Sequence, residues 1–171
     1  MKRSVLLVGV ICGLGVFWAG EATACGDKFL VIGRGARRVP KARHPAAVLL
    51  YLRPGSSLPM AAKDMRLEAT LRQAGHGVET LTEPASFREA LAARRYDFVL
   101  VDLADAAAVQ KAAEGQNPRP QVVPVAYKAS PETLQALESQ HDIVIRAGKS
   151  LSYLAELDQA MGRRASALAS R

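Results

Sequence analysis

Short apolar runs alternate with amphipathic segments over most of this chain, and the clearest of these runs is Phe98–Val101. It places four apolar residues in a row, and Asp102 follows directly. An unbroken apolar run of this length predicts a strand in the middle of a parallel sheet, with helices covering both faces. Asp102 would then stand at the carboxyl end of a central strand, where open α/β sheets form their ligand crevice.

Four further runs predict the other strands of the same sheet. They are Ala47–Leu52, Val78–Thr82, Gln121–Ala126 and Asp142–Arg146. Helical spacing and helix-boundary residues between the runs predict five helices: Met60–Ala74, Ser86–Arg94, Asp105–Glu114, Ser130–Ser139, and a last helix from Ser150 or Ser152 to Met161. This alternation predicts one α/β domain over residues 47–161, a doubly wound five-stranded parallel sheet in a flavodoxin-like three-layer sandwich.

The N-terminus has the pattern of a secretory signal peptide over residues 1–24. A positive start, Met1–Arg3, precedes the apolar run Ser4–Trp18, and Ala22-Thr23-Ala24 forms an A-x-A cleavage site. A retained membrane anchor is the alternative, but the run is short for a span of roughly 20 apolar residues. We therefore expect export, with the mature protein in the periplasm.

Cleavage at this site would leave Cys25 as the first residue and the one cysteine of the mature protein, so no internal disulfide is expected. The sequence Ala22-Thr23-Ala24-Cys25 resembles the bacterial lipoprotein processing motif, in which the cysteine is acylated. That family usually carries Leu where Ala22 stands here. Lipid attachment at Cys25 is the prediction, and ordinary cleavage that leaves a free thiol is the alternative.

The net charge of +7 is concentrated in two flanking segments. Residues 25–46 contain six Lys or Arg and a single acidic residue, residues 47–160 carry a net −2, and the segment from Met161 adds +3. Such basic arms indicate an anionic membrane surface as a possible partner, beside an unknown protein partner. Nucleic acid is not expected, because the basic run Arg37–Arg43 contains no aromatic residue for stacking. We expect residues 25–46 to form a solvated linker and residues 162–171 a flexible tail.

Catalytic and metal-binding motifs are weak. His44, His76 and His141 lie far apart in the sequence, without the close spacing of metal ligands, so no metal site is predicted. Ser56 and Ser57 follow Gly55 without a Gly-x-Ser-x-Gly elbow. No enzymatic activity and no cofactor are expected.

The third predicted strand and its surroundings resemble a known domain. Tyr96–Leu103, within the alternation over 47–161, resembles the third strand of the response-regulator receiver domain. The resemblance implies that Asp102 stands at the position of the phosphoryl-accepting aspartate.

Three departures from that family imply that the phosphorylation chemistry is lost. The metal-binding carboxylates after the first strand are replaced by Tyr51-Leu52-Arg53, and phosphoryl transfer relies on a cation. The expected Ser or Thr is missing from Val123–Lys128, and the lysine after the fifth strand gives way to Arg146-Ala147-Gly148, with Lys149 displaced. Asp102 would then be a vestigial phosphoacceptor.

We expect Asp102, Arg53 and Lys128 to converge at the carboxyl edge of the sheet, either as a salt bridge or as a site for a small anion. The predicted function is an exported, membrane-tethered, non-catalytic receiver-like domain that acts through protein or surface contacts. The alternative is a periplasmic binding protein for a small anion, with its site in the crevice at the strand ends.

Overall fold

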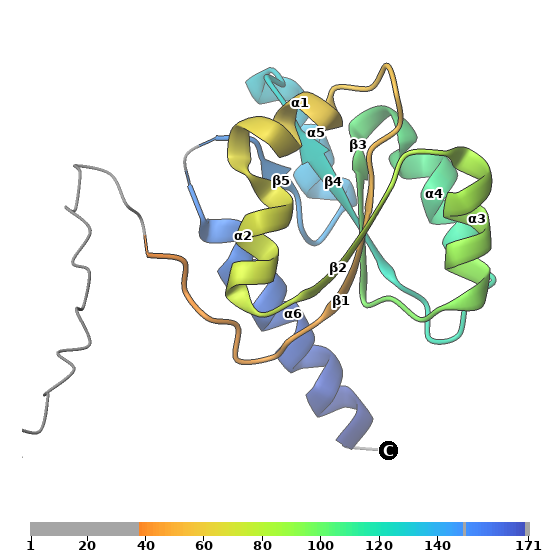
Figure 1. The fold of residues 1–171 in the computed structure, drawn as a ribbon. Coiled ribbons are helices and arrows are strands. Elements are labelled where there is room, and N and C mark those ends of the chain that lie inside the picture. Colours follow the sequence, from red (N-terminus) through yellow and green to blue (C-terminus); the bar gives the residue numbers. More distant parts are fainter. Residues whose placement is uncertain (1–37, 149, 170–171) are drawn as a thin grey trace, which may run out of the picture. The chain divides into compact units, whose positions relative to one another are not determined.

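A computed structural model of the 171-residue chain describes residues 38–148 and 150–169. The described part contains a five-stranded parallel sheet of order β2-β1-β3-β4-β5. Its strands are β1 (Ala47–Tyr51), β2 (Gly77–Leu81), β3 (Phe98–Asp102), β4 (Gln121–Ala126) and β5 (Ile145–Arg146). The α/β class, the parallel sheet and the flavodoxin-like strand order are those predicted from the sequence (Figure 1). The predicted signal peptide and Cys25 lie outside the described residues.

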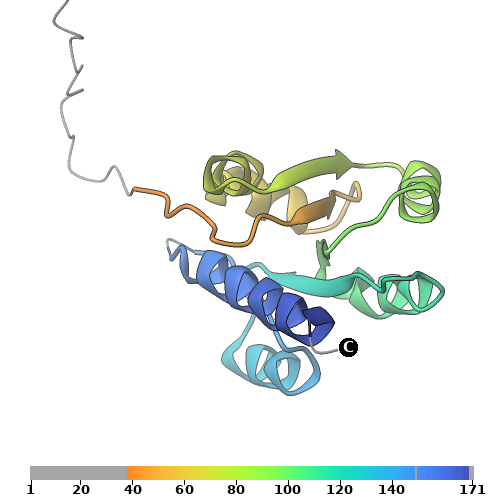
Figure 2. The same cartoon turned by 90° about the horizontal axis from the view of Figure 1, so that it is seen from below.

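Helices cover the sheet on both faces (Figures 1 and 2). They are α1 (Leu58–Met65), α2 (Leu67–Ala74), α3 (Pro84–Ala93), α4 (Ala106–Ala113), α5 (Pro131–Gln140) and α6 (Ser152–Ala169), with a short 3₁₀ helix, η1 (Leu103–Asp105), before α4. Helices α1, α2 and α6 pack on one face of the sheet, and α3 and α4 pack on the other. Leu137 of α5 contacts Ala126 and Val144 at the β5 end.

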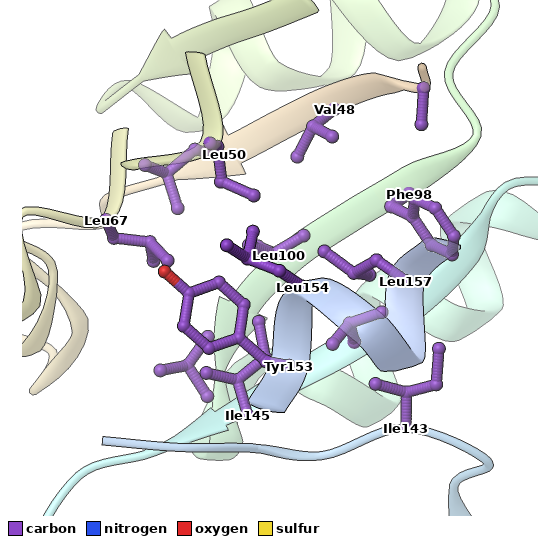
Figure 3. Close-up of a cluster of buried hydrophobic side chains, with 14 of the residues drawn as sticks. Val48, Leu50, Leu67, Phe98, Leu100, Ile143, Ile145, Tyr153, Leu154 and Leu157 are labelled. Atoms are coloured by element: carbon purple, nitrogen blue, oxygen red, sulfur yellow. The ribbon is translucent and has the colours of Figure 1, made fainter. Parts of the chain in front are cut away.

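The core on the first face is centred on α6 (Figure 3). Tyr153, Leu154 and Leu157 of this helix meet Phe98 and Leu100 of the central strand, and all five are at most 4% exposed. Full burial of a side chain of this size stabilises a fold by roughly 1.5–3 kcal/mol. The central strand is therefore fixed by side chains from the far end of the chain.

The predicted helix Met60–Ala74 is two helices, because Arg66 adopts a left-handed conformation with φ of 50°. In an unbroken helix, Leu58 and Leu67 would point in opposite directions, since nine residues at about 100° each leave them about 180° apart. The break turns the chain so that both leucines are fully buried against the sheet. Helical periodicity alone could not reveal this rearrangement.

Other boundaries also differ from the prediction. Helix α3 begins at Pro84, with Glu83 rather than Ser86 as N-cap, and β5 pairs only through Ile145 and Arg146. The largest correction concerns the C-terminus, where α6 continues to Ala169 instead of giving way to a flexible tail at residue 162. Arg164 anchors this extension, because its guanidinium donates to the carbonyls of Asp97 (2.8 Å) and Arg119 (3.2 Å).

Residues 38–46, called here the N-terminal strap, are docked on the domain, so the described part of the predicted linker is not a free solvated connector. The Ala42 N–H donates to the carbonyl of Ala74 (2.8 Å), and the Lys41 ammonium donates to the carbonyl of Gln73 (2.7 Å). The backbone N–H of His44 donates to Asp158 of α6 (2.7 Å). Proline-rich sequence favours extended backbone but does not show whether that backbone finds partners.

None of the described helices combines the length and the apolar character needed to cross a membrane.

Candidate functional site

Asp102 is the last residue of β3 and is only 5% exposed. Its strand lies between β1 and β4, so its side chain faces the loop that leaves β1. Residues Arg53–Ser57 form this loop, with Gly55 at φ of +81°, before α1 begins at Leu58. Asp102 thus lies where the sequence predicted it, at the carboxyl edge of the sheet.

Both oxygens of the Asp102 carboxylate accept hydrogen bonds from within the domain. Oδ2 accepts from the Ser57 backbone N–H (2.8 Å), the Ser57 hydroxyl (2.6 Å) and the Leu58 N–H (3.1 Å). Oδ1 accepts from the Ala104 N–H (2.9 Å), which caps η1. The carboxylate therefore lies at the N-termini of α1 and η1, where backbone N–H groups lack helical partners and the helix dipole favours an anion.

These contacts keep Asp102 charged despite its burial. Desolvation acts to raise the pKa of the carboxyl, but the hydrogen bonds from the Ser57 hydroxyl and the backbone amides outweigh it and hold the pKa below its usual value. Hydrogen bonds to an ionised acceptor are also stronger than neutral ones. Asp102 is thus a negative charge that the fold itself binds.

Arg53 does not pair with Asp102. Its Nε donates to Oδ2 of Asp105 at 2.9 Å, and this hydrogen bond is the main reason that the pKa of Arg53 is raised. Asp105 is 16% exposed and Arg53 is 39% exposed, so the pair lies at the rim of the strand ends. The predicted Asp102–Arg53 salt bridge is therefore wrong.

Lys128 does not pair with Asp102 either. It follows β4 with a left-handed φ of 53°, and its ammonium lies 5.0 Å from the centre of the Tyr127 ring. The Tyr127 hydroxyl donates to Asp64 at 2.7 Å. Among the described residues Lys128 has no ion pair, and neither Arg53 nor Lys128 forms a salt bridge with Asp102. Three backbone N–H groups and the Ser57 hydroxyl donate to the Asp102 carboxylate instead.

The end of β1 carries an aromatic residue, Tyr51, in place of a metal-binding carboxylate. Tyr51 is 5% exposed and stacks on Phe87 of α3, with the ring centres 4.4 Å apart. Its neighbour Leu52 packs against the opposite core. Within residues 38–148 and 150–169, no group of three or more His, Cys, Asp or Glu side chains is placed to hold a metal ion.

Sequence reasoning missed Ser57, the residue that matters most for Asp102. It stands just before an apolar helix, which is a typical N-cap position, but its hydroxyl makes no cap hydrogen bond within α1. It donates instead across the sheet edge to a residue 45 positions away in the sequence. The sequence thus indicated a cap at Ser57 but not the partner of its hydroxyl.

The chain matches no protein-family model, and no curated protein matches it.

Proposed function

We propose that this chain is an exported, membrane-tethered, non-catalytic receiver-like domain that acts through protein or surface contacts. The single observation that supports this best is the internal occupation of Asp102. A carboxylate that accepts hydrogen bonds from the first N–H groups of two helices is a structural element, and these contacts engage both oxygens that could accept a phosphoryl group.

Phosphorylation of Asp102 would require one of its oxygens to attack phosphorus. Oδ2 already accepts three hydrogen bonds and Oδ1 accepts one, and the residue is 5% exposed. Attack would therefore break the cap of α1 or η1. Arg53, the nearest sequence candidate for charge neutralisation, is paired with Asp105. The Arg53–Asp105 pair also weighs against the alternative of a small-anion site at this edge, because it engages one of the two cations proposed for that site.

The proposed membrane tether consists of Cys25, as the site of lipid attachment, and the basic segment that follows it. The described domain begins at residue 38, so the thirteen residues from Cys25 can span at most about 45 Å at roughly 3.3–3.6 Å per residue. One acyl chain anchors weakly, and each Lys or Arg near anionic headgroups adds about 1 kcal/mol. Acylation and the basic segment would together hold the domain close to the membrane.

The phosphorylation part of the proposal is tested with acetyl phosphate and Mg²⁺, followed by intact-mass measurement. We expect no added phosphoryl group on the wild-type protein, because both carboxylate oxygens are occupied. Asp102→Asn is the matched control. A gain of one phosphoryl group in the wild type that disappears in Asp102→Asn would overturn the non-catalytic assignment.

The tether is tested by cell fractionation of the wild type, Cys25→Ser and Cys12→Ser. The third variant removes the other cysteine of the chain, which lies in the predicted signal peptide. We expect membrane recovery for the wild type and Cys12→Ser, and soluble periplasmic protein for Cys25→Ser. Wild-type protein in the soluble periplasm with an unmodified Cys25 thiol would reject lipid attachment.

A further inference from the structure

A cavity of about 570 Å³ lies beneath the N-terminal strap, at the opposite end of β1 from Asp102. Its lining includes Lys41, Arg43 and His44 of the strap, His76 of the turn before β2, and Asp158 and Gly162 of α6. Gly162 makes room for the strap, because a Cβ there would come within 3.3 Å of the His44 ring. The cavity is therefore a partly open groove between segments that are far apart in the sequence.

His76 contributes a buried hydrogen-bond donor without an acceptor. The residue is 4% exposed, and its Nδ1 accepts from the Ala46 N–H at 3.2 Å. This contact requires a lone pair on Nδ1, so the neutral ring carries its proton on Nε2. Nε2 is buried and has no hydrogen-bond partner among the described residues. A buried donor that lacks an acceptor is costly, and a ligand oxygen would relieve that cost.

The other charged groups of the lining also leave donors in excess. Asp158 is the acidic residue of the lining, and it accepts from the His44 N–H at 2.7 Å while the His44 imidazole lies 3.4 Å away. Lys41 uses one hydrogen bond of its ammonium on the Gln73 carbonyl, and three donors are available to that group. Arg43 is exposed on the strap. Lys41 and Arg43 thus bring two cations to a lining whose one carboxylate, Asp158, is already engaged.

We propose that this cavity binds a small oxyanion, a carboxylate or phosphate group, through His76, Lys41 and Arg43. The Nε2–H of His76 would donate to one ligand oxygen from inside, and the two cations would close over the ligand from the strap. Because the cavity lies at the other edge of the sheet from Asp102, this inference does not depend on the proposed function. A bound anion would also join the strap to α6 and strengthen their contact.

The oxyanion could be a soluble molecule or the headgroup of an anionic phospholipid, since both present the same oxygens. Heteronuclear NMR of the purified protein separates these sources, because the imidazole resonances of His76 report directly from the cavity. The probes are inorganic phosphate, succinate, and a short-chain phosphatidylglycerol kept below its micelle concentration. We expect a saturable change at the His76 Nε2–H with at least one of them. Saturation by phosphate or succinate assigns a soluble anion, and saturation by the lipid alone assigns a headgroup.

Variants at exposed positions test the role of charge without removing a buried group. Arg43→Gln should weaken binding about tenfold, equivalent to about 1.4 kcal/mol, as should Lys41→Gln. Arg88→Gln makes the same change in charge on α3, away from the cavity lining, and should leave the affinity unchanged. The His76 resonances without ligand show whether each variant keeps the strap in place. No saturable change with any probe, or equal weakening by Arg88→Gln, would overturn the proposal.

Discussion

Replacing Asp102 with alanine tests the structural role of this carboxylate most directly. The substitution removes the acceptor of four hydrogen bonds and leaves the N–H groups of Ser57, Leu58 and Ala104 without it. The Ser57 hydroxyl can rotate toward water, but backbone N–H groups cannot move without unwinding the helix starts. The damage is therefore concentrated at the beginnings of α1 and η1.

The magnitude follows from the number and burial of the orphaned donors. Each unsatisfied buried donor costs about 1–3 kcal/mol. Leu58 is fully buried, whereas Ser57 is partly accessible and Ala104 is exposed, so water can restore some of their hydrogen bonds. We expect Asp102→Ala to lower the free energy of unfolding by about 3–5 kcal/mol, a large part of the 5–15 kcal/mol of typical stability. At roughly 2–4 °C per kcal/mol, the thermal midpoint should fall by about 10 °C.

Thermal and urea unfolding followed by circular dichroism measure this loss. The matched control is Asp105→Asn, which also removes one negative charge at the strand ends but breaks only the partly exposed pair with Arg53. That pair should contribute no more than about 1 kcal/mol. A thermal midpoint of Asp102→Ala close to that of the wild type, or a larger loss for Asp105→Asn, would refute the capping argument.

Three further outcomes follow from the same structure. Folding lowers the pKa of the Asp102 carboxyl. Its contribution to the free energy of unfolding is therefore complete above the unfolded pKa of about 3.9 and is lost as the pH falls through the folded pKa. The stability of Asp102→Asn should accordingly decline less in acid than that of the wild type. Burial lowers the pKa of His76, although Asp158 opposes the shift. The unfolded chain therefore binds more protons below about pH 6.5, and wild-type stability should fall there, whereas His76→Gln should show a flatter profile. Arg164→Gln should speed amide hydrogen exchange in the last turns of α6 and lower the free energy of unfolding by about 1 kcal/mol, because its hydrogen bonds are lost. Arg163→Gln, at the exposed neighbouring position, should change neither quantity. Equal effects of the two variants would refute the anchoring role.

The sequence alone determined the class of fold, because the periodicity of apolar residues is a local property that can be read without knowing the tertiary contacts. The apolar run Phe98–Val101 is fully buried in the central strand β3, as predicted. Ser130 and Pro131 begin α5, where the Ser130 hydroxyl accepts from the Thr133 N–H at 3.2 Å. In these elements the local signal and the tertiary packing agree.

Tertiary structure alone decided which groups meet. Asp102 could be placed at the strand end from the sequence, but its partners depend on where the loop after β1 directs its N–H groups. The long side chain of Arg53 can reach more than one carboxylate at the strand ends, and in the structure it contacts Asp105. The left-handed turn at Arg66 likewise satisfies the sheet rather than the helix pattern. Such pairings join residues distant along the chain, so they depend on the positions of backbone groups that only the folded sheet fixes.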